Sequence, residues 1–231
     1  MSDRDAAKQA AAEAAVALVQ DGMKVGLGTG STAYFAIEAL IRRVRGGLNI
    51  VAVATSERSA MQARQGGIPM TTFGEHPRLD LTIDGADEIQ LGTLSLIKGL
   101  GGALLREKIV AAASNCLIIV ADAPKLVDRL GGTAPVPVEV VPFGWETTSA
   151  RLEKLGVNPA LRRTQAGEPF RTDGGNLIVD CHVGLIEDPA ALDQSIGQTI
   201  GVVETGLFIG IAKQAFIADD RSVREITRSR S

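Results

Sequence analysis

Four ionisable side chains lie close together in the chain, with glycines between them. Asp84 and Asp87 follow a predicted strand over residues 79–83. Lys98 precedes a glycine-rich run, and Glu107 lies further on, in a helical pattern. Carboxylates act as general acids or bases and accept hydrogen bonds from hydroxyl groups, whereas a lysine stabilises negative charge that develops in a reaction. Together these residues predict a site for a polar ligand.

Each of these residues also has a simpler interpretation. Asp84 and Asp87 could form turns or cap a helix, but Asp84 directly follows an apolar strand and the Gly-Ala pair after it leaves space for a ligand. Lys98 follows two apolar residues, which favours a side chain that points into a cleft. Glu107 belongs to an Arg-Glu-Lys triplet, and most helical triplets of this kind are exposed. Local spacing alone therefore favours an exposed Glu107.

A second candidate element is the loop Gly28-Thr29-Gly30-Ser31-Thr32, between a predicted strand and a predicted helix. Glycines permit a tight backbone, and the hydroxyl groups, the N–H groups and the helix N-terminus favour an anion such as phosphate. The loop lacks the Gly-Lys-Ser/Thr ending of a Walker loop and the third glycine of a dinucleotide fingerprint. The alternative is an ordinary strand-to-helix turn capped by Ser or Thr.

The elements that must position these residues alternate between strand and helix. Strands are expected at residues 24–27, 49–54, 79–83 and 117–121, with shorter ones at 68–72 and 95–97. Helices are expected at residues 5–20, 33–45, 57–65 and 103–114. The longer strands are mostly continuous apolar runs, which is typical of a parallel sheet covered on both faces. The first part of the chain is therefore predicted to be an α/β, Rossmann-like doubly wound sheet.

In such a sheet, ligands bind outside the carboxyl ends of the strands. The residues just past the predicted strands are the 28–32 loop, Thr55-Ser56, Asp84 with Asp87, and Asp122 with Lys125. They are far apart in the sequence but should meet at one edge of the sheet. This convergence supports a single site more strongly than any one motif does.

The pattern changes near residues 131–137, where glycines and prolines accumulate. Beyond them the sequence predicts strands at 138–141, 161–164, 170–172, 176–182 and 201–205, and helices at 146–155 and 189–196. This β-α-β-β-α-β order is typical of a ferredoxin-like α+β unit. We expect residues 132–206 to be an inserted domain, and residues 1–131 plus 207–231 to form the first domain. The polar tail after Asp219, with Arg221, Arg224, Arg228 and Arg230, is expected to be solvated and partly frayed.

Composition narrows the functional classes. The 231-residue chain has a net charge of −3 and 3% aromatic residues, which argues against nucleic-acid binding. Cys116 and Cys181 lie in apolar runs without metal-ligand spacing, so no metal site is expected. No apolar run approaches the roughly 18 residues that span a bilayer, and the N-terminus does not resemble a signal peptide. We expect a soluble, cytoplasmic protein without a membrane partner.

Four segments in register closely resemble the type A ribose-5-phosphate isomerases. They are residues 26–32 (GLGTGST), residues 82–88 (TIDGADE), Ile97-Lys98-Gly99 followed by Arg106-Glu107-Lys108, and Asp122 with Lys125. The resemblance covers nearly the whole chain, including the inserted segment and residues 201–208 (GVVETGLF). Leu100 is a departure, since it interrupts the glycine run that usually follows the lysine.

The resemblance implies an intramolecular oxidoreductase that interconverts D-ribose 5-phosphate and D-ribulose 5-phosphate through an enediolate. This is a step of the non-oxidative pentose phosphate pathway and is expected to need no metal or other cofactor. Glu107 would be the base, Asp84 would assist ring opening and Lys98 would stabilise the oxyanion. The implied substrate-binding residues are Thr29, Gly30, Ser31, Thr32, Asp84, Gly85, Ala86, Asp87, Lys98, Gly99, Leu100, Gly101, Lys125 and Lys8. The implied partners are a small-molecule sugar phosphate and further copies of the chain, in a homodimer or homotetramer.

The residues suit this chemistry on their own terms. Aldose–ketose isomerisation needs one carboxylate that reaches two adjacent carbons, because the same group removes and returns the proton. A positioned base contributes about 10²–10⁴-fold in rate. Lys98 would supply the positive charge for the oxyanion, and a phosphate held by residues 28–32 would fix the substrate's position.

Three alternative functions remain open from the sequence. A sugar-phosphate sensor would keep the 28–32 loop but has no need of Asp84, Lys98 and Glu107 together. A CoA transferase of related architecture would use a glutamate as nucleophile. A nucleotide-binding dehydrogenase would require the dinucleotide fingerprint that is incomplete here.

Overall fold

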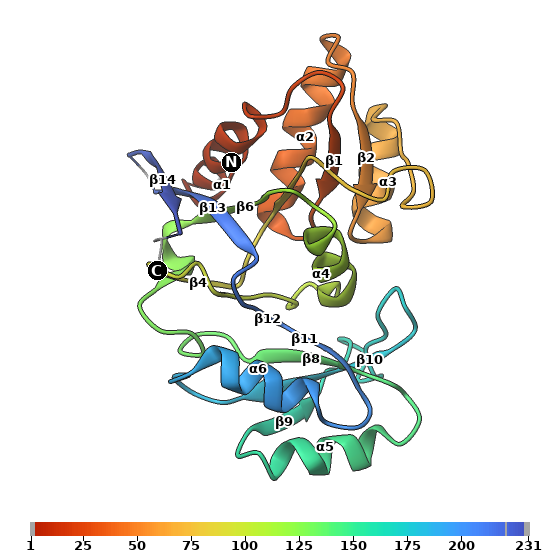
Figure 1. Ribbon diagram of the computed structural model, residues 1–231, viewed down its shortest axis with the longest axis vertical. Helices are drawn as coiled ribbons and strands as arrows, with labels where there is room; N and C mark the ends of the chain where they lie inside the picture. Colours follow the sequence, from red (N-terminus) through yellow and green to blue (C-terminus); the bar gives the residue numbers. More distant parts are fainter. Residues whose placement is uncertain (1–2, 220, 229–231) are drawn as a thin grey trace.

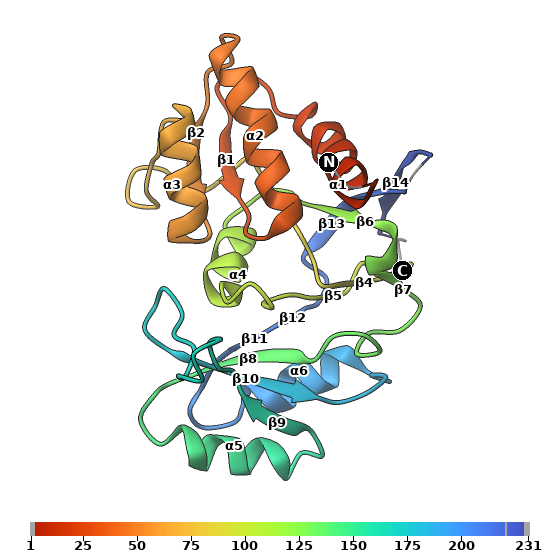
Figure 2. The ribbon, with the colours of Figure 1, turned by 180° about the vertical axis from the view of Figure 1, so that it is seen from behind.

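The computed structural model describes residues 3–219 and 221–228, and it contains three sheets (Figure 1, Figure 2). A six-stranded main sheet with helices beside it forms the upper part of Figure 1. A second body of strands and helices, which we call the lower unit (residues 136–205), lies below it. A small sheet and helix α4 lie between the two.

The main sheet has the strand order β14-β13-β6-β3-β1-β2. Its members are β1 (Lys24–Leu27), β2 (Val51–Ala54), β3 (Leu81–Asp84), β6 (Leu117–Asp122), β13 (Ala212–Ala218) and β14 (Val223–Thr227). Every neighbouring pair is parallel except β13 with β14. The predicted mostly parallel sheet is therefore confirmed, and its carboxyl edge collects the ends of β1, β2, β3 and β6.

Alternate residues of β6 show how this sheet is buried on both faces. Ile118 and Val120 pack into a cluster with α1 (Asp3–Val16) and α2 (Ser31–Arg45). Leu117 and Ile119 point to the other face, into a cluster that includes residues of α4 and of the small sheet. Helix α3 (Glu57–Gly66) packs beside α2 and β2 on the first face. Such two-sided burial explains why the strands read as continuous apolar runs.

The second face differs from the expected layer of helices. It is covered by α4 (Leu104–Ala112) together with the small sheet. This sheet has the order β12-β5-β4-β7, with β4 (Glu88–Gln90), β5 (Leu96–Ile97), β7 (Leu126–Val127) and β12 (Leu207–Phe208). Strands of two or three residues are too short to show a period of two, so no sequence pattern indicates a separate sheet.

The lower unit follows the predicted β-α-β-β-α-β order. Its elements are β8 (Val136–Val140), α5 (Trp145–Glu153), β9 (Asn158–Leu161), β10 (Leu177–His182), α6 (Pro189–Gly197) and β11 (Val202–Thr205). The sheet order is β11-β8-β10-β9, with antiparallel neighbours throughout. The chain then returns through β12 to the main sheet, as expected for residues 207–218.

Several predicted boundaries were wrong. The helix expected over residues 5–20 ends at Val16, because tighter turns from Leu18 to Ala15 and from Val19 to Val16 fold Val19 into the core. The strand expected at 68–72 is only a single bridge from Met70 to Ala52.

The hairpin expected from 161–164 and 170–172 and the tail also differ. The hairpin contains one isolated bridge, between Arg163 and Pro169, and the regular strand lies earlier, in β9. The tail was expected to fray, but residues 223–227 form β14, which pairs with the otherwise unpaired edge of β13. Arg230 lies outside the described residues.

Among residues 3–219 and 221–228, no helix combines the length and the apolar character needed to cross a membrane.

A buried carboxylate joins the small sheet to the segment that leads into the lower unit. Glu88 is fully buried and accepts hydrogen bonds from the N–H groups of Gly131, Thr133 and Ala134 and from the Thr133 hydroxyl, at 2.6–2.8 Å. A carboxylate accepts without donating, so it suits a pocket lined only by donors.

Glu88→Gln should therefore lower the free energy of unfolding by about 2–4 kcal/mol, because the amide NH₂ would face one of these donors and leave it unsatisfied. Urea denaturation measures the change. Glu168→Gln, at an exposed position, is the control and should stay within about 0.5 kcal/mol of the wild type. Equal stability of the two variants would contradict the role assigned to Glu88.

Candidate active site

A cavity of about 290 Å³ opens at the carboxyl edge of the main sheet. Its lining comes from α1, the loop before α2 and the start of α2, the loops after β3 and β5, α4, and the end of β6 with the turn after it. The lining residues are Arg4, Lys8, Thr29, Gly30, Ser31, Thr32, Gly85, Ala86, Asp87, Lys98, Gly99, Gly101, Glu107, Asp122 and Lys125. Segments far apart in the sequence thus meet at one edge.

A buried charge cluster lies at the floor of this cavity. The Lys98 ammonium is 3.0 Å from Asp84 Oδ2 and 3.5 Å from Glu107 Oε2, and it donates a hydrogen bond to the Gly85 carbonyl oxygen at 2.5 Å. The side chains of Asp84, Lys98 and Glu107 are at most 3% exposed. Glu107 is therefore not the exposed helical charge that its Arg-Glu-Lys context favoured.

Asp84 connects the Lys98 ammonium to the loop before α2. Its Oδ1 accepts hydrogen bonds from the N–H groups of Thr29 at 3.0 Å and Gly85 at 2.7 Å, while Oδ2 faces Lys98. Gly28 makes this approach possible, since a Cβ atom there would lie 2.1 Å from Asp84 Oδ1. Asp84 is fully buried and does not line the cavity, in contrast to Lys98 and Glu107.

Burial dominates the ionisation of this cluster. Burial raises the pKa of Glu107 to about 8; Lys98 acts in the opposite direction, and the charges of Asp84 and Asp87 add to the increase. Burial also raises the pKa of Asp84, against the effects of Lys98 and the two N–H donors. For Lys98, burial would lower the pKa, but the neighbouring carboxylates outweigh it and raise the pKa. Glu107 therefore combines a protonatable carboxyl with access to the cavity.

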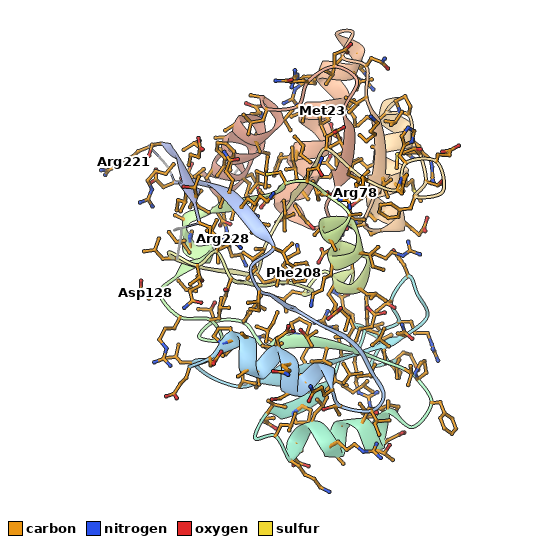
Figure 3. All side chains as sticks on the ribbon, in the orientation of Figure 1. Met23, Arg78, Asp128, Phe208, Arg221 and Arg228 are labelled. Carbon is orange, nitrogen blue, oxygen red and sulfur yellow. The ribbon has the colours of Figure 1, made fainter. Side chains whose placement is uncertain are left out.

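The Lys98 side chain is also supported by an aromatic ring. Its ammonium lies 5.5 Å from the centre of the Phe208 ring, and the Lys108 ammonium lies 4.9 Å from the same ring. Figure 3 shows Phe208 in the middle of the molecule, between the main sheet and the lower unit. The ring is fully buried and favours the charged form of Lys98.

The loop after Lys98 is held from the Asp87 side. Asp87 Oδ2 accepts a hydrogen bond from the Leu100 N–H at 2.9 Å, and the Asp87 N–H donates to the Ile97 carbonyl oxygen. Gly99 and Gly101 line the cavity, whereas Leu100 does not and is 44% exposed. Of the catalytic and substrate-binding residues that the family resemblance implied, only Asp84 and Leu100 do not line this cavity.

The 28–32 loop presents backbone and hydroxyl groups to the cavity. Gly30 precedes α2 with a φ of 121°, and no side chain caps the N-terminus of that helix. The Thr29 hydroxyl points inward instead, to within 2.7–2.8 Å of the Thr55 and Ser56 hydroxyl oxygens. Thr55 and Ser56, predicted at the same sheet edge, therefore hold the loop in place through hydrogen bonds to the Thr29 hydroxyl. An anion at this helix N-terminus would meet free N–H groups.

Cationic side chains also line the cavity. Lys8 and Lys125 line it, as the resemblance implied, and so does Arg4, which was not predicted from the sequence. The Arg4 guanidinium lies 2.6 Å from Asp122 Oδ2, and this carboxylate is 4% exposed. The available signal was the spacing of Arg4 and Lys8, four residues apart on one helix face.

Among the described residues, no group of three or more His, Cys, Asp or Glu side chains is arranged to hold a metal ion. What the cavity does combine is a buried carboxyl with a raised pKa, a buried lysine and an uncapped helix N-terminus.

Comparisons with known proteins agree with this geometry. A family model described as ribose 5-phosphate isomerase A (phosphoriboisomerase A) matches residues 51–222. The protein named ribose-5-phosphate isomerase A of Gloeobacter violaceus is 57% identical to this chain, and the match covers 98% of this chain and 98% of that protein. A solved ribose 5-phosphate isomerase from Plasmodium falciparum is 39% identical, with a TM-score of 0.93 over 98% of this chain and 100% of that one.

A further solved structure is that of a D-ribose-5-phosphate isomerase in complex with phospho-erythronic acid. It is 34% identical, with a TM-score of 0.94, and the match covers 99% of this chain and 100% of that chain. Sequence and fold therefore agree over essentially the full length of the chain, which belongs to the ribose 5-phosphate isomerase A family.

Proposed function

We propose that this protein interconverts D-ribose 5-phosphate and D-ribulose 5-phosphate, without a metal ion, in the pentose phosphate pathway. The observation that carries the proposal is the pairing of Glu107 with Lys98 at the floor of a cavity whose wall holds an uncapped helix N-terminus. The Glu107–Lys98 pair suits proton transfer beside an oxyanion, and the helix N-terminus suits a phosphate.

The chemistry follows from the contacts. Glu107 removes the proton from C2 of open-chain ribose 5-phosphate, and the electron pair moves through C1 to the carbonyl oxygen O1. The resulting enediolate carries its negative charge near the Lys98 ammonium. Glu107 then returns the proton to C1, while the O2 proton moves to O1 and C2 becomes the carbonyl carbon. One carboxyl group serves both carbons, so no second base is required.

The other residues hold the substrate in place. Ser31, Thr32 and the α2 N–H groups bind the phosphate, with Lys8 and Lys125 supplying positive charge; we add Arg4 to this set. Asp87 binds sugar hydroxyls. The ring-opening role implied for Asp84 stays a prediction; its contacts support a role in fixing Lys98 and the Thr29 N–H group.

Phospho-erythronic acid, the ligand of a related solved structure, is consistent with this substrate. Erythronic acid has four carbons and a planar carboxylate, so its phosphate resembles a shortened enediolate of a five-carbon sugar phosphate. A ligand of this kind would place its carboxylate beside Lys98 and its phosphate at the α2 N-terminus.

We also propose a domain division and an assembly. Residues 132–206 form an inserted ferredoxin-like domain within a Rossmann-like domain of residues 1–131 and 207–231; the strand order β11-β8-β10-β9 supports this. The chain forms a homodimer or homotetramer. Phe143 and Ile200 are 95% and 75% exposed, and the Val141 N–H to Gly201 carbonyl hydrogen bond brings their segments together, which supports a subunit contact there. Both cysteines are free thiols, which supports a reducing, cytoplasmic location.

The purified protein, assayed with a chelator present, should convert ribose 5-phosphate to ribulose 5-phosphate. In deuterated water the product should carry deuterium at C1, because Glu107 exchanges its proton with solvent before returning it. Nuclear magnetic resonance of the product reads the label. Binding without turnover would favour a sugar-phosphate sensor, and exchange of CoA with an acyl donor would favour a CoA transferase.

Glu107→Gln should lower kcat by at least about 10²–10⁴-fold, because the amide cannot accept the C2 proton. Binding of phospho-erythronic acid, measured by calorimetry, should be retained because the phosphate subsite is intact. Glu146→Gln is the matched control, since Glu146 also lies in the first turn of a helix but does not line the cavity. Wild-type turnover in Glu107→Gln would remove Glu107 from the role of base.

The pH dependence follows from the raised pKa of Glu107. A base must be deprotonated to act, and the pKa of about 8 means that this form is scarce below pH 8. Between about pH 6.5 and 8, kcat/KM should rise by up to about tenfold per pH unit and then level off. This window lies above the second ionisation of a phosphate monoester, near about pH 6. A flat profile across it would show that Glu107 ionises at a much lower pH.

A further inference from the structure

The lower unit contacts the active-site loop through a largely buried arginine, among other residues. Arg162 follows β9, and its Nη1 donates hydrogen bonds to the carbonyl oxygens of Gly99 at 2.8 Å and Leu100 at 3.1 Å. Both carbonyls belong to the short loop between Lys98 and the helix that carries Glu107. The Arg162 side chain is 12% exposed, so little water competes for these bonds.

The guanidinium is itself fixed in position. Asp180 of β10 accepts hydrogen bonds from Nε at 2.9 Å and from Nη2, in the two-bond geometry that orients an arginine most firmly. The Phe170 ring lies 5.9 Å from the guanidinium carbon. Arg162 therefore has one well-defined orientation relative to the sheet of the lower unit.

The Phe170 ring also contacts the end of the loop that leads into α4. A Cβ atom on Gly102 would lie 2.4 Å from the Phe170 ring, so the backbone of Gly102 rests directly on it. Gly102 has a φ of 83°, in the region that favours glycine. Arg162 and Phe170 together contact the loop at Gly99, Leu100 and Gly102.

These contacts determine which way the peptide groups face. The peptide between Gly99 and Leu100 is held at both edges, by Arg162 on its carbonyl and by Asp87 on its N–H. In a trans peptide the N–H points away from the carbonyl. With its carbonyl bound to Arg162, the Leu100–Gly101 peptide turns its N–H away from Arg162, and this N–H has no acceptor among the described residues. Gly101 itself lines the cavity.

We propose that Arg162 is a positioning residue for the isomerase reaction: it fixes the 99–102 loop so that the Gly101 N–H and Lys98 face the reacting oxygens together. This inference rests on the proposed function. It gives the lower unit a direct part in turnover, since the orientation of an active-site peptide depends on a side chain from that unit.

The test compares Arg162→Met with Arg163→Met, a matched control in which the side chain of the neighbouring arginine donates to the Gly167 carbonyl oxygen of its own hairpin. Arg162→Met should lower kcat about 10- to 100-fold, the effect of a misplacement of about 1 Å. The dissociation constant of phospho-erythronic acid should change less than about threefold, since the phosphate subsite provides most of its binding. The pH at which kcat/KM levels off should not move. Arg163→Met should stay within about twofold of the wild type in each measurement.

A second readout needs no substrate. Amide hydrogen exchange of the peptide spanning residues 99–103 should be faster in Arg162→Met than in the wild type and unchanged in Arg163→Met. Arg162→Lys should recover part of kcat, because an ammonium can still bind one of the two carbonyls. If Arg162→Met does not fold, Phe170→Leu takes its place, with an expected loss in kcat of about 3- to 10-fold.

The outcomes separate the two proposals. An active wild type with an unchanged kcat in Arg162→Met overturns the positioning role alone. The same holds if kcat falls while exchange at residues 99–103 is unchanged, because the loss would then not pass through the loop. An inactive wild type overturns the proposed function, and the positioning role with it.

Discussion

Burying one lysine ammonium constrains the whole site. An amine with almost no contact with water must be matched by negative charge, and Asp84 and Glu107 lie on either side of Lys98. Two carboxylates exceed one ammonium, so the cluster has one negative charge too many. Asp84 Oδ1 accepts two N–H hydrogen bonds, whereas Asp84 Oδ2 and Glu107 Oε2 accept none among the described residues and face the Lys98 ammonium. Burial is the main cause of the raised pKa of Glu107, and the charges of Asp84 and Asp87 add to it, which makes Glu107 a stronger base than an ordinary glutamate.

Each member of this cluster comes from a different element. Asp84 ends a central strand of the main sheet, Lys98 follows a strand of the small sheet, and Glu107 lies in the first turn of α4. The small sheet therefore positions the lysine as well as covering one face. Because α4 contacts both the main sheet and the lower unit, Glu107 is fixed by packing from two sides. Neither body could position the cluster alone.

The sequence was informative where long elements repeat a pattern, and uninformative where short elements meet. The strands before Gly28, Thr55, Asp84 and Asp122 were recognisable as apolar runs. The rule that ligands bind at strand ends then predicted that the residues after these strands share one site. The small sheet was missed because two residues show no period. The local sequence around Glu107 is that of an exposed helix, so only the family resemblance identified it; its burial arises from contacts with distant segments. Arg4 was missed because it lies in α1, whereas most of the cavity wall is formed by segments that follow the strands.

The return of the chain through β12 has a consequence for how the protein is made. The Lys98 N–H donates to the carbonyl oxygen of Gly206, and its ammonium lies against Phe208. Both partners leave the ribosome long after Lys98, when the intervening lower unit has already been synthesised. Pairings between residues so distant in sequence form late, because the intervening segment must first be ordered. Until then the lysine lacks its backbone anchor and its aromatic support, so a nascent chain that has already emerged as far as α4 still holds an unfinished site.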